Sequence, residues 1–123
     1  MPRRRTSPQV GEAALADWLA TGSSQSRVTA VRFTLEELAE RAPGNAVEIR
    51  VPPFGAVQAL SGPTHRRGTP PAVIETDADT WLGLATGRIA WDDACARGLI
   101  STSGARADLS AALPLFDPGL RLP

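Results

Sequence analysis

Hydrophobic and polar residues follow two different periods along this chain, and the two periods predict an ordered series of helices and strands. Val47, Ile49 and Val51 alternate with polar neighbours, which is typical of a strand with one buried face. In other stretches the apolar residues recur every three or four positions, as on one face of a helix. Strands are expected at residues 46–51, 54–60, 72–76 and 99–103, and helices at 10–20, 27–41, 78–85, 91–97 and 108–113.

Residues that cap or break regular structure set the expected limits of these elements. Gly22 and Gly87 should end helices, and Asp77 should cap the helix that begins after it. Thr34 is expected to act as a helix cap within residues 27–41, because two glutamates then fall in the first turn that follows.

Two proline-containing segments interrupt the strand pattern. Pro52 and Pro53 predict a bulge or an edge position between the first two strands. Residues 61–71 hold two glycines and three prolines, and they predict a long exposed loop or a hairpin connection whose ends extend the neighbouring strands.

The composition is that of one folded domain. The chain has 123 residues, of which 42% are hydrophobic and 21% charged, close to the average for globular proteins. We expect a single domain at residues 10–116, preceded by a flexible basic arm at residues 1–9 and followed by an irregular tail at residues 117–123.

Charge balance and cysteine content exclude several classes of protein. The 13 basic and 13 acidic residues cancel, which argues against a nucleic-acid partner. No apolar run approaches the roughly 20 residues of a transmembrane segment, and none follows the N-terminal arginines as it does in a signal peptide. The single cysteine cannot form an internal disulfide, so we expect a cytoplasmic protein.

The polar residues do not form a catalytic motif. His65, Arg66 and Arg67 lie together in the proline-rich loop, where they are either solvated or bind the carboxylate or phosphate head group of a ligand. An enzyme that uses His65 is a further hypothesis. The sequence does not favour it, because no serine lies in a nucleophile elbow and the glycines lack the spacing of a phosphate-binding loop. We therefore expect no enzymatic activity.

The acidic residues and the cysteine have structural explanations. Asp77, Asp79, Asp92 and Asp93 fall where helices begin, so capping explains them better than a metal site does. Cys95 lies among alanines in a short helix and is expected to be a small buried residue. No metal site is predicted.

The large apolar residues either fill the core or line a pocket. Core packing is the simpler explanation, because an indole or phenyl ring is readily buried without a ligand. Trp81 and Trp91 lie on consecutive helices joined by a glycine turn, and they would form one wall of a cavity. The candidate ligand-binding residues are Phe54, Trp81, Leu82, Leu84, Trp91, Leu113 and Phe116.

The order of elements in residues 72–115 resembles that of the sterol carrier protein type two superfamily. The likeness rests on a helix that ends in Ala-x-Gly (TWLGLATG, residues 80–87), a short helix that ends in glycine (residues 91–98) and a strand with glycine (LISTSG, residues 99–104). Residues 48–57 (EIRVPPFGAV) and 67–71 (RGTPP) are similar to a branch of bacterial sterol carrier orthologues found in actinobacteria.

The resemblance implies an α+β fold with a mainly antiparallel five-stranded sheet, helices on one face and an apolar tunnel between them. A fifth strand would then lie within residues 61–71. It also implies a non-catalytic carrier for a fatty acyl or sterol-like ligand, without a cofactor. The alternative is a ligand-free accessory domain that partners an enzyme such as a mycothiol-dependent isomerase.

The chain departs from the lipid-binding members where it carries Arg97 and the charged segment at residues 105–108. Because a charge beside a lipid tunnel is costly unless paired, either Arg106 and Asp108 point outward or the cavity is small, polar-mouthed or closed. A void lined by Trp81, Leu84, Trp91 and Leu113 would favour a carrier, with residues 113–116 as its lid, whereas a filled interior would favour an accessory domain.

Overall fold

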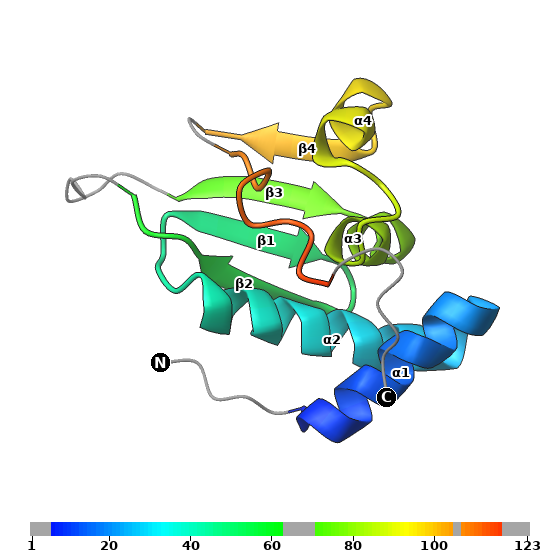
Figure 1. The fold of residues 1–123 in the computed structure, drawn as a ribbon. Helices are drawn as coiled ribbons and strands as arrows, with labels where there is room; N and C mark the ends of the chain where they lie inside the picture. The colour runs from blue at the N-terminus through cyan, green and yellow to red at the C-terminus, as the bar shows by residue number, and fades with distance from the viewer. Residues whose placement is uncertain (1–5, 63–70, 105–106, 117–123) are drawn as a thin grey trace.

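The computed structural model describes residues 6–62, 71–104 and 107–116 of the protein, in which four helices and four strands form one layered unit (Figure 1). The predicted tail and residues 1–5 of the predicted arm lie outside these residues, whereas residues 6–9 are described and the first helix begins within them, at Pro8, so the flexible arm was predicted too long. The helices are α1 (Pro8–Thr21), α2 (Ser24–Arg41), α3 (Ala78–Ala85) and α4 (Trp91–Ala96), and the strands are β1 (Val47–Val51), β2 (Gly55–Ala59), β3 (Ala72–Thr76) and β4 (Ile100–Ser103).

The described strands form a mixed sheet with the order β2-β1-β3-β4. β1 and β2 make an antiparallel hairpin across the turn that contains Pro52 and Pro53, β1 and β3 are parallel, and β3 and β4 are antiparallel. Two of the three pairings are antiparallel, as a mainly antiparallel sheet requires, but β3 returns beside β1 in the same direction and the described residues hold four strands where five were expected. The fifth strand was expected within residues 61–71, of which residues 63–70 lie outside the described residues.

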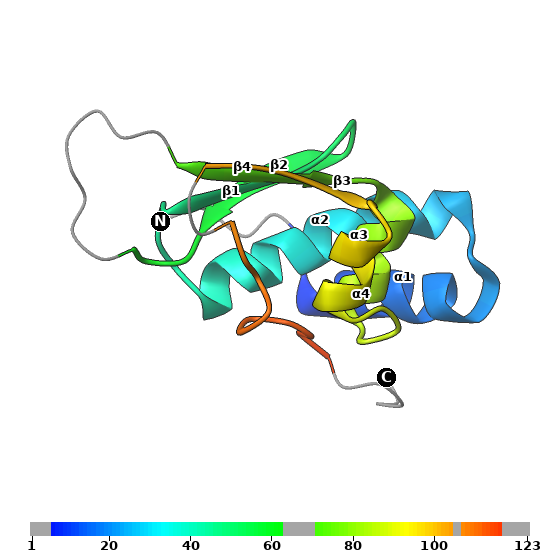
Figure 2. The ribbon, with the colours of Figure 1, turned by 90° about the horizontal axis from the view of Figure 1, so that it is seen from above.

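All four helices lie on the same side of this sheet, and α1 packs against α2 (Figure 2). On β1, Val47, Ile49 and Val51 point toward the helices and are at most 3% exposed, while Arg50 between them is exposed. The alternation predicted from the sequence and the placement of the helices on one face are both confirmed.

Two of the predicted helix limits are confirmed by the backbone geometry. Gly22 ends α1 in the left-handed conformation, with a φ of 67°, which glycine adopts without the steric cost that a side chain brings. Asp77 caps α3, and its carboxylate accepts a hydrogen bond from the Thr80 amide at 3.3 Å.

The cap predicted at Thr34 was wrong. α2 begins ten residues earlier in the chain, where the Ser23 hydroxyl accepts from the amide of Gln25. Thr34 lies in the helix interior and is fully buried, and its hydroxyl donates to the carbonyl of Ala30 at 2.8 Å. A threonine can occupy such a position because it satisfies its hydroxyl within its own helix.

The end of the described chain also differs from the prediction. Residues 108–113 were expected to form a helix but form a turn, in which the Asp108 carboxylate accepts from the amide of Ser110 at 2.8 Å. The Asp108 side chain therefore offers the backbone an alternative to a helical hydrogen bond. We name residues 107–116 the C-terminal strap, which appears in orange to red below the helices in Figure 2.

Cys95 is exposed, so its predicted burial was wrong. The buried face of α4 carries Trp91 and Ala94, and the residue that follows Ala94 turns about 100° away from the core. Asp92 and Asp93 lie in the first turn, as expected, although α4 has no side-chain cap and its N-cap residue is Ala90. In these positions the carboxylates complement the partial positive charge of the helix N-terminus.

A candidate apolar binding cavity

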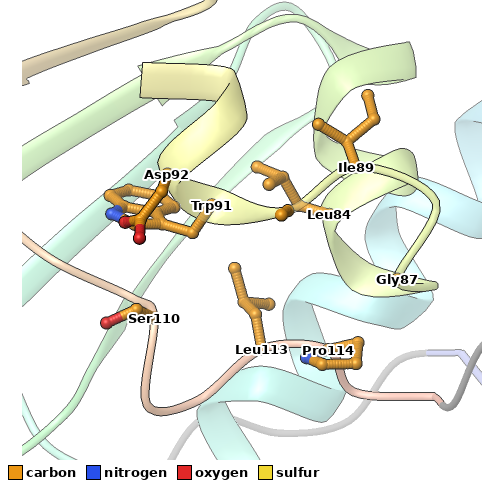
Figure 3. Close-up of a pocket in the computed structure, with 9 residues that line it drawn as sticks. Leu84, Gly87, Ile89, Trp91, Asp92, Ser110, Leu113 and Pro114 are labelled. Carbon is orange, nitrogen blue, oxygen red and sulfur yellow. The ribbon is translucent and has the colours of Figure 1, made fainter. Parts of the chain in front are cut away.

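A cavity of about 460 Å³ lies between the connection from α3 to α4 and the C-terminal strap (Figure 3). Its floor is buried, since Leu84 is 1% and Trp91 is 9% exposed, whereas Ala90, Asp92 and Ser110 on its rim are exposed. A volume of this size falls within the range of about 300–1,000 Å³ that is typical of small-molecule sites. The lining residues are Leu84, Gly87, Ile89, Ala90, Trp91, Asp92, Ser110, Leu113 and Pro114.

The upper wall is fixed by the connection between α3 and α4. α3 ends at Ala85, and Gly87 then adopts a φ of 78°, which reverses the chain. The amide of Ile89 donates to the carbonyl of Gly83 at 3.1 Å, so the connection folds back against α3. This short path brings Leu84 at the end of α3 and Trp91 at the start of α4 to the same cavity.

The lower wall is the C-terminal strap, which is tied to two helices. The amides of Leu115 and Phe116 both donate to the carbonyl of Ala85, at 2.9 and 3.0 Å. Arg41 at the end of α2 donates to the carbonyl of Leu115 and lies over the ring of Phe116, with its guanidinium carbon 5.1 Å from the ring centroid. These contacts hold Leu113 and Pro114 of the strap opposite α3.

The core beneath the cavity is held by a second aromatic contact. The Phe116 ring stacks on Phe33 of α2 with a centroid separation of 6.1 Å. Because Phe33 is 2% exposed and belongs to the packed core, the strap is continuous with the interior of the domain. The cavity is therefore formed by packed elements on both sides.

Most of the cavity lining is apolar. Leucine, isoleucine, alanine, tryptophan and proline side chains supply most of it, and the Asp92 carboxylate, the Ser110 hydroxyl and the indole N–H of Trp91 supply its polar side-chain groups. In Figure 3 the Leu113 side chain points toward Leu84 across the open space, while Asp92 and Ser110 lie on the other side of the lining. Such a site can hold an apolar body and hydrogen-bond one polar end.

The rim of the cavity carries negative charge. The pKa of the Cys95 thiol is raised, chiefly by desolvation and further by the carboxylates of Asp92 and Asp108. The pKa of the Asp108 carboxyl is lowered because the backbone and side chain of Ser110 hydrogen-bond to it. Asp108 is therefore ionised at neutral pH and, with Asp92, makes the local potential negative.

Three of the seven predicted ligand-binding residues, Leu84, Trp91 and Leu113, line this cavity. Trp81 and Leu82 are fully buried in the core instead. Phe116 anchors the strap, and Phe54 is half-buried at the turn between β1 and β2, where its carbonyl accepts from Arg32 at 3.3 Å. The predicted head-group residues His65, Arg66 and Arg67 lie outside the described residues.

Sequence reasoning missed several of the residues that line the cavity. Ile89 and Pro114 carry the one signal that was present, since each is an apolar residue in a connection that has no helical or strand periodicity of its own. Ala90 and Ser110 carry no such signal because their side chains are small and their neighbours set their positions. The missed residues are Gly87, Ile89, Ala90, Asp92, Ser110 and Pro114.

Among the described residues, no group of three or more histidine, cysteine, aspartate or glutamate side chains is arranged to hold a metal ion. No helix among these residues is long and apolar enough to cross a bilayer.

A four-stranded mixed sheet with helices on one face and a cavity beside the last helix defines a small α+β domain. The family described as bacterial SCP ortholog matches residues 23–115, which span all of the described strands and the cavity. The chain belongs to this sterol carrier protein-like family, which is of the lipid-carrier type, and the resemblance seen in the sequence is confirmed. A search of curated proteins finds no match.

Proposed function

We propose that this protein is a non-catalytic binding module that holds a lipid-like ligand in the cavity between the α3–α4 connection and the C-terminal strap. The observation that carries the proposal is an apolar cavity of about 460 Å³ in a member of a sterol carrier-like family. The buried floor accommodates an acyl chain or a comparable apolar body, and the exposed rim gives it a path from solvent.

Burial of apolar surface supplies the binding energy in this proposal. Each buried methylene contributes about 0.8 kcal/mol, so eight of them contribute roughly 6 kcal/mol before the cost of ordering the ligand. Micromolar to millimolar dissociation constants then follow, and they suit a carrier that must also release its ligand. The cytoplasm, where Cys95 stays reduced, is the compartment that we propose for this exchange.

The competing proposal is an accessory domain that binds no ligand and partners an enzyme. The densely filled core favours it, because Trp81 and Leu82 occupy the region between sheet and helices in which the tunnel was expected. The cavity at the strap favours the carrier, since Leu84, Trp91 and Leu113 meet around open space there. The two proposals make opposite predictions for the purified protein.

Native mass spectrometry of the purified protein tests the carrier proposal. We expect an excess mass over the bare chain, with a matching acyl or sterol-like species in the organic extract. A bare mass that persists after incubation with long-chain alcohols, amines and fatty acids would contradict the carrier proposal and leave the accessory domain.

A further inference from the structure

The polar side-chain groups of the cavity lining are the Asp92 carboxylate, the Ser110 hydroxyl and the indole N–H of Trp91, and none of them is a cation. Asp92 is the charged residue among the described lining residues, and Ser110 is the other side chain with a hydrogen-bonding oxygen. Figure 3 shows both on one side of the lining, while Ile89 and Pro114 lie on the opposite side. The lining is therefore divided into an apolar part and a polar part, whose charged group among the described residues is a carboxylate.

Negative charge extends beyond the lining on the same rim. The Asp108 carboxylate accepts a hydrogen bond from the Ser110 amide at 2.8 Å, and the Ser110 side chain also hydrogen-bonds to it. The charges of Asp92 and Asp108 both act on the thiol of Cys95, so their fields overlap on this side of the molecule. A ligand end at this rim meets a negative potential from two carboxylates.

The two described arginines nearest to Asp92 in sequence, Arg88 and Arg97, both interact with other groups. Arg88 donates to the carbonyl of Leu19 at 2.9 Å and lies over the ring of Trp18, with its guanidinium carbon 5.6 Å from the ring centroid. Arg97 pairs with Asp93 one turn earlier on α4, at 3.6 Å, and both side chains are exposed. Arg106 lies outside the described residues.

From this arrangement we infer that the cavity selects ligands whose polar end donates hydrogen bonds and carries no negative charge, such as an alcohol or an amine. A carboxylate or phosphate end would face Asp92 without a described cation to balance it, and like charges repel. A hydroxyl or ammonium group can donate to the Asp92 carboxylate, and charged acceptors make the stronger hydrogen bonds. This inference rests on the proposed function and specifies the ligand class of the same cavity.

Three ligands with one chain length and different ends test the inference. Decanol, decylammonium and decanoate are titrated by calorimetry into the wild-type protein and into Asp92→Asn, at neutral pH, low salt and concentrations below micelle formation. Asp93→Asn is the matched control, because it removes the same charge from the next residue of α4, which pairs with Arg97 and does not line the cavity.

We expect Asp92→Asn to strengthen decanoate binding and weaken decylammonium binding, each by roughly two- to fivefold, which is the effect of one exposed ion pair. The affinity for decanol should change less. Asp93→Asn should leave the ratio of the affinities for decanoate and decylammonium near its wild-type value. Because the effect is electrostatic at an exposed rim, added salt should reduce it.

Two results would overturn the inference, and they are distinguishable. If decanoate binds the wild-type protein more tightly than both other ligands, or if Asp92→Asn and Asp93→Asn shift the ratio equally, the cavity binds ligands but does not select their ends in this way. If none of the three ligands binds, the proposed function itself fails and the inference fails with it.

Discussion

The indole nitrogen of Trp81 donates a hydrogen bond to the hydroxyl oxygen of Thr34 at 2.8 Å, between α3 and α2, and both residues are fully buried. The same hydroxyl donates to the carbonyl of Ala30, so every polar atom of this contact is satisfied in the core. This bond sets the position of α3, whose last turn supplies Leu84 and Ala85 to the cavity and the strap.

Replacing Thr34 with valine should destabilise the protein by about 1–3 kcal/mol, because the N–H of Trp81 is then buried without an acceptor. Thr34→Ser is the control that keeps the hydroxyl, and it should cost less. Urea denaturation followed by tryptophan fluorescence measures both. Equal stability of Thr34→Val and wild type would show that the indole finds another partner.

Arg41 should control how often the C-terminal strap opens. Arg41→Ala removes the bond to the Leu115 carbonyl and the contact with the Phe116 ring, each of which favours the closed strap. We expect amide hydrogen exchange at Leu115 and Phe116 to accelerate about tenfold, since a charged hydrogen bond contributes about 1.5 kcal/mol or more.

Arg50→Ala is the matched control for Arg41→Ala, because Arg50 is exposed on β1 and pairs there with Glu48. It should leave exchange at Leu115 and Phe116 unchanged. If both variants behave alike, the strap is held by its backbone bonds to Ala85 and not by the arginine.

Cys95 should be a slow nucleophile despite its exposure. Its pKa is raised by desolvation and by Asp92 and Asp108, so the reactive thiolate forms at higher pH than in an unperturbed cysteine. At neutral pH, iodoacetamide should therefore alkylate Cys95 more slowly than it alkylates a model thiol. The midpoint of the pH dependence of this alkylation should lie at higher pH for Cys95 than for the model thiol.

Removing the charge of Asp92 or Asp108 by substitution with asparagine should lower the alkylation midpoint of Cys95 part of the way, because desolvation, the largest cause, remains. Asp17→Asn on α1 is the control, since Asp17 is exposed on another helix and should have no effect. A midpoint at or below that of the model thiol would contradict the negative potential at this rim.

A tryptophan at Ala90 should block the cavity without disturbing the core. Ala90 is exposed on the rim and has an extended backbone that any residue adopts, with φ −77° and ψ 145°. Ala90→Trp should lose ligand binding in native mass spectrometry while its thermal stability stays close to wild type. Ala96→Trp, at an exposed position of α4 outside the lining, should bind normally.

Local sequence patterns were enough to predict most of the elements and one face of the sheet. The alternation of Val47, Ile49 and Val51 with polar residues predicts a half-buried strand without reference to any other segment. Asp77 and Gly22 likewise predict helix ends from their own side-chain and backbone properties. Thr34 carries the same local chemistry as a cap, but the contact with Trp81 places it inside a helix. Tertiary packing decided that position, and no local pattern contains it.

The sequence patterns did not predict which distant segments of the chain pair with each other. β1 and β3 are parallel neighbours although twenty residues separate them, and nothing in either strand specifies that partner. Only part of the cavity lining could be predicted, for the same reason. Leu84 and Trp91 were predicted from their helical faces, whereas Ala90 and Ser110 line the cavity because of the path that two connections take. The path of a connection depends on the elements that it joins.

The most direct test of the cavity as a ligand site is a titration of the nitrogen-15-labelled protein with decanol, followed by amide chemical shifts. We predict saturable shifts that cluster at Leu84, at residues 87–92 and at residues 110–113, with the exposed face of β1 and β3 unaffected. Shifts confined to that open face, or no saturable shift at any position, would contradict the account.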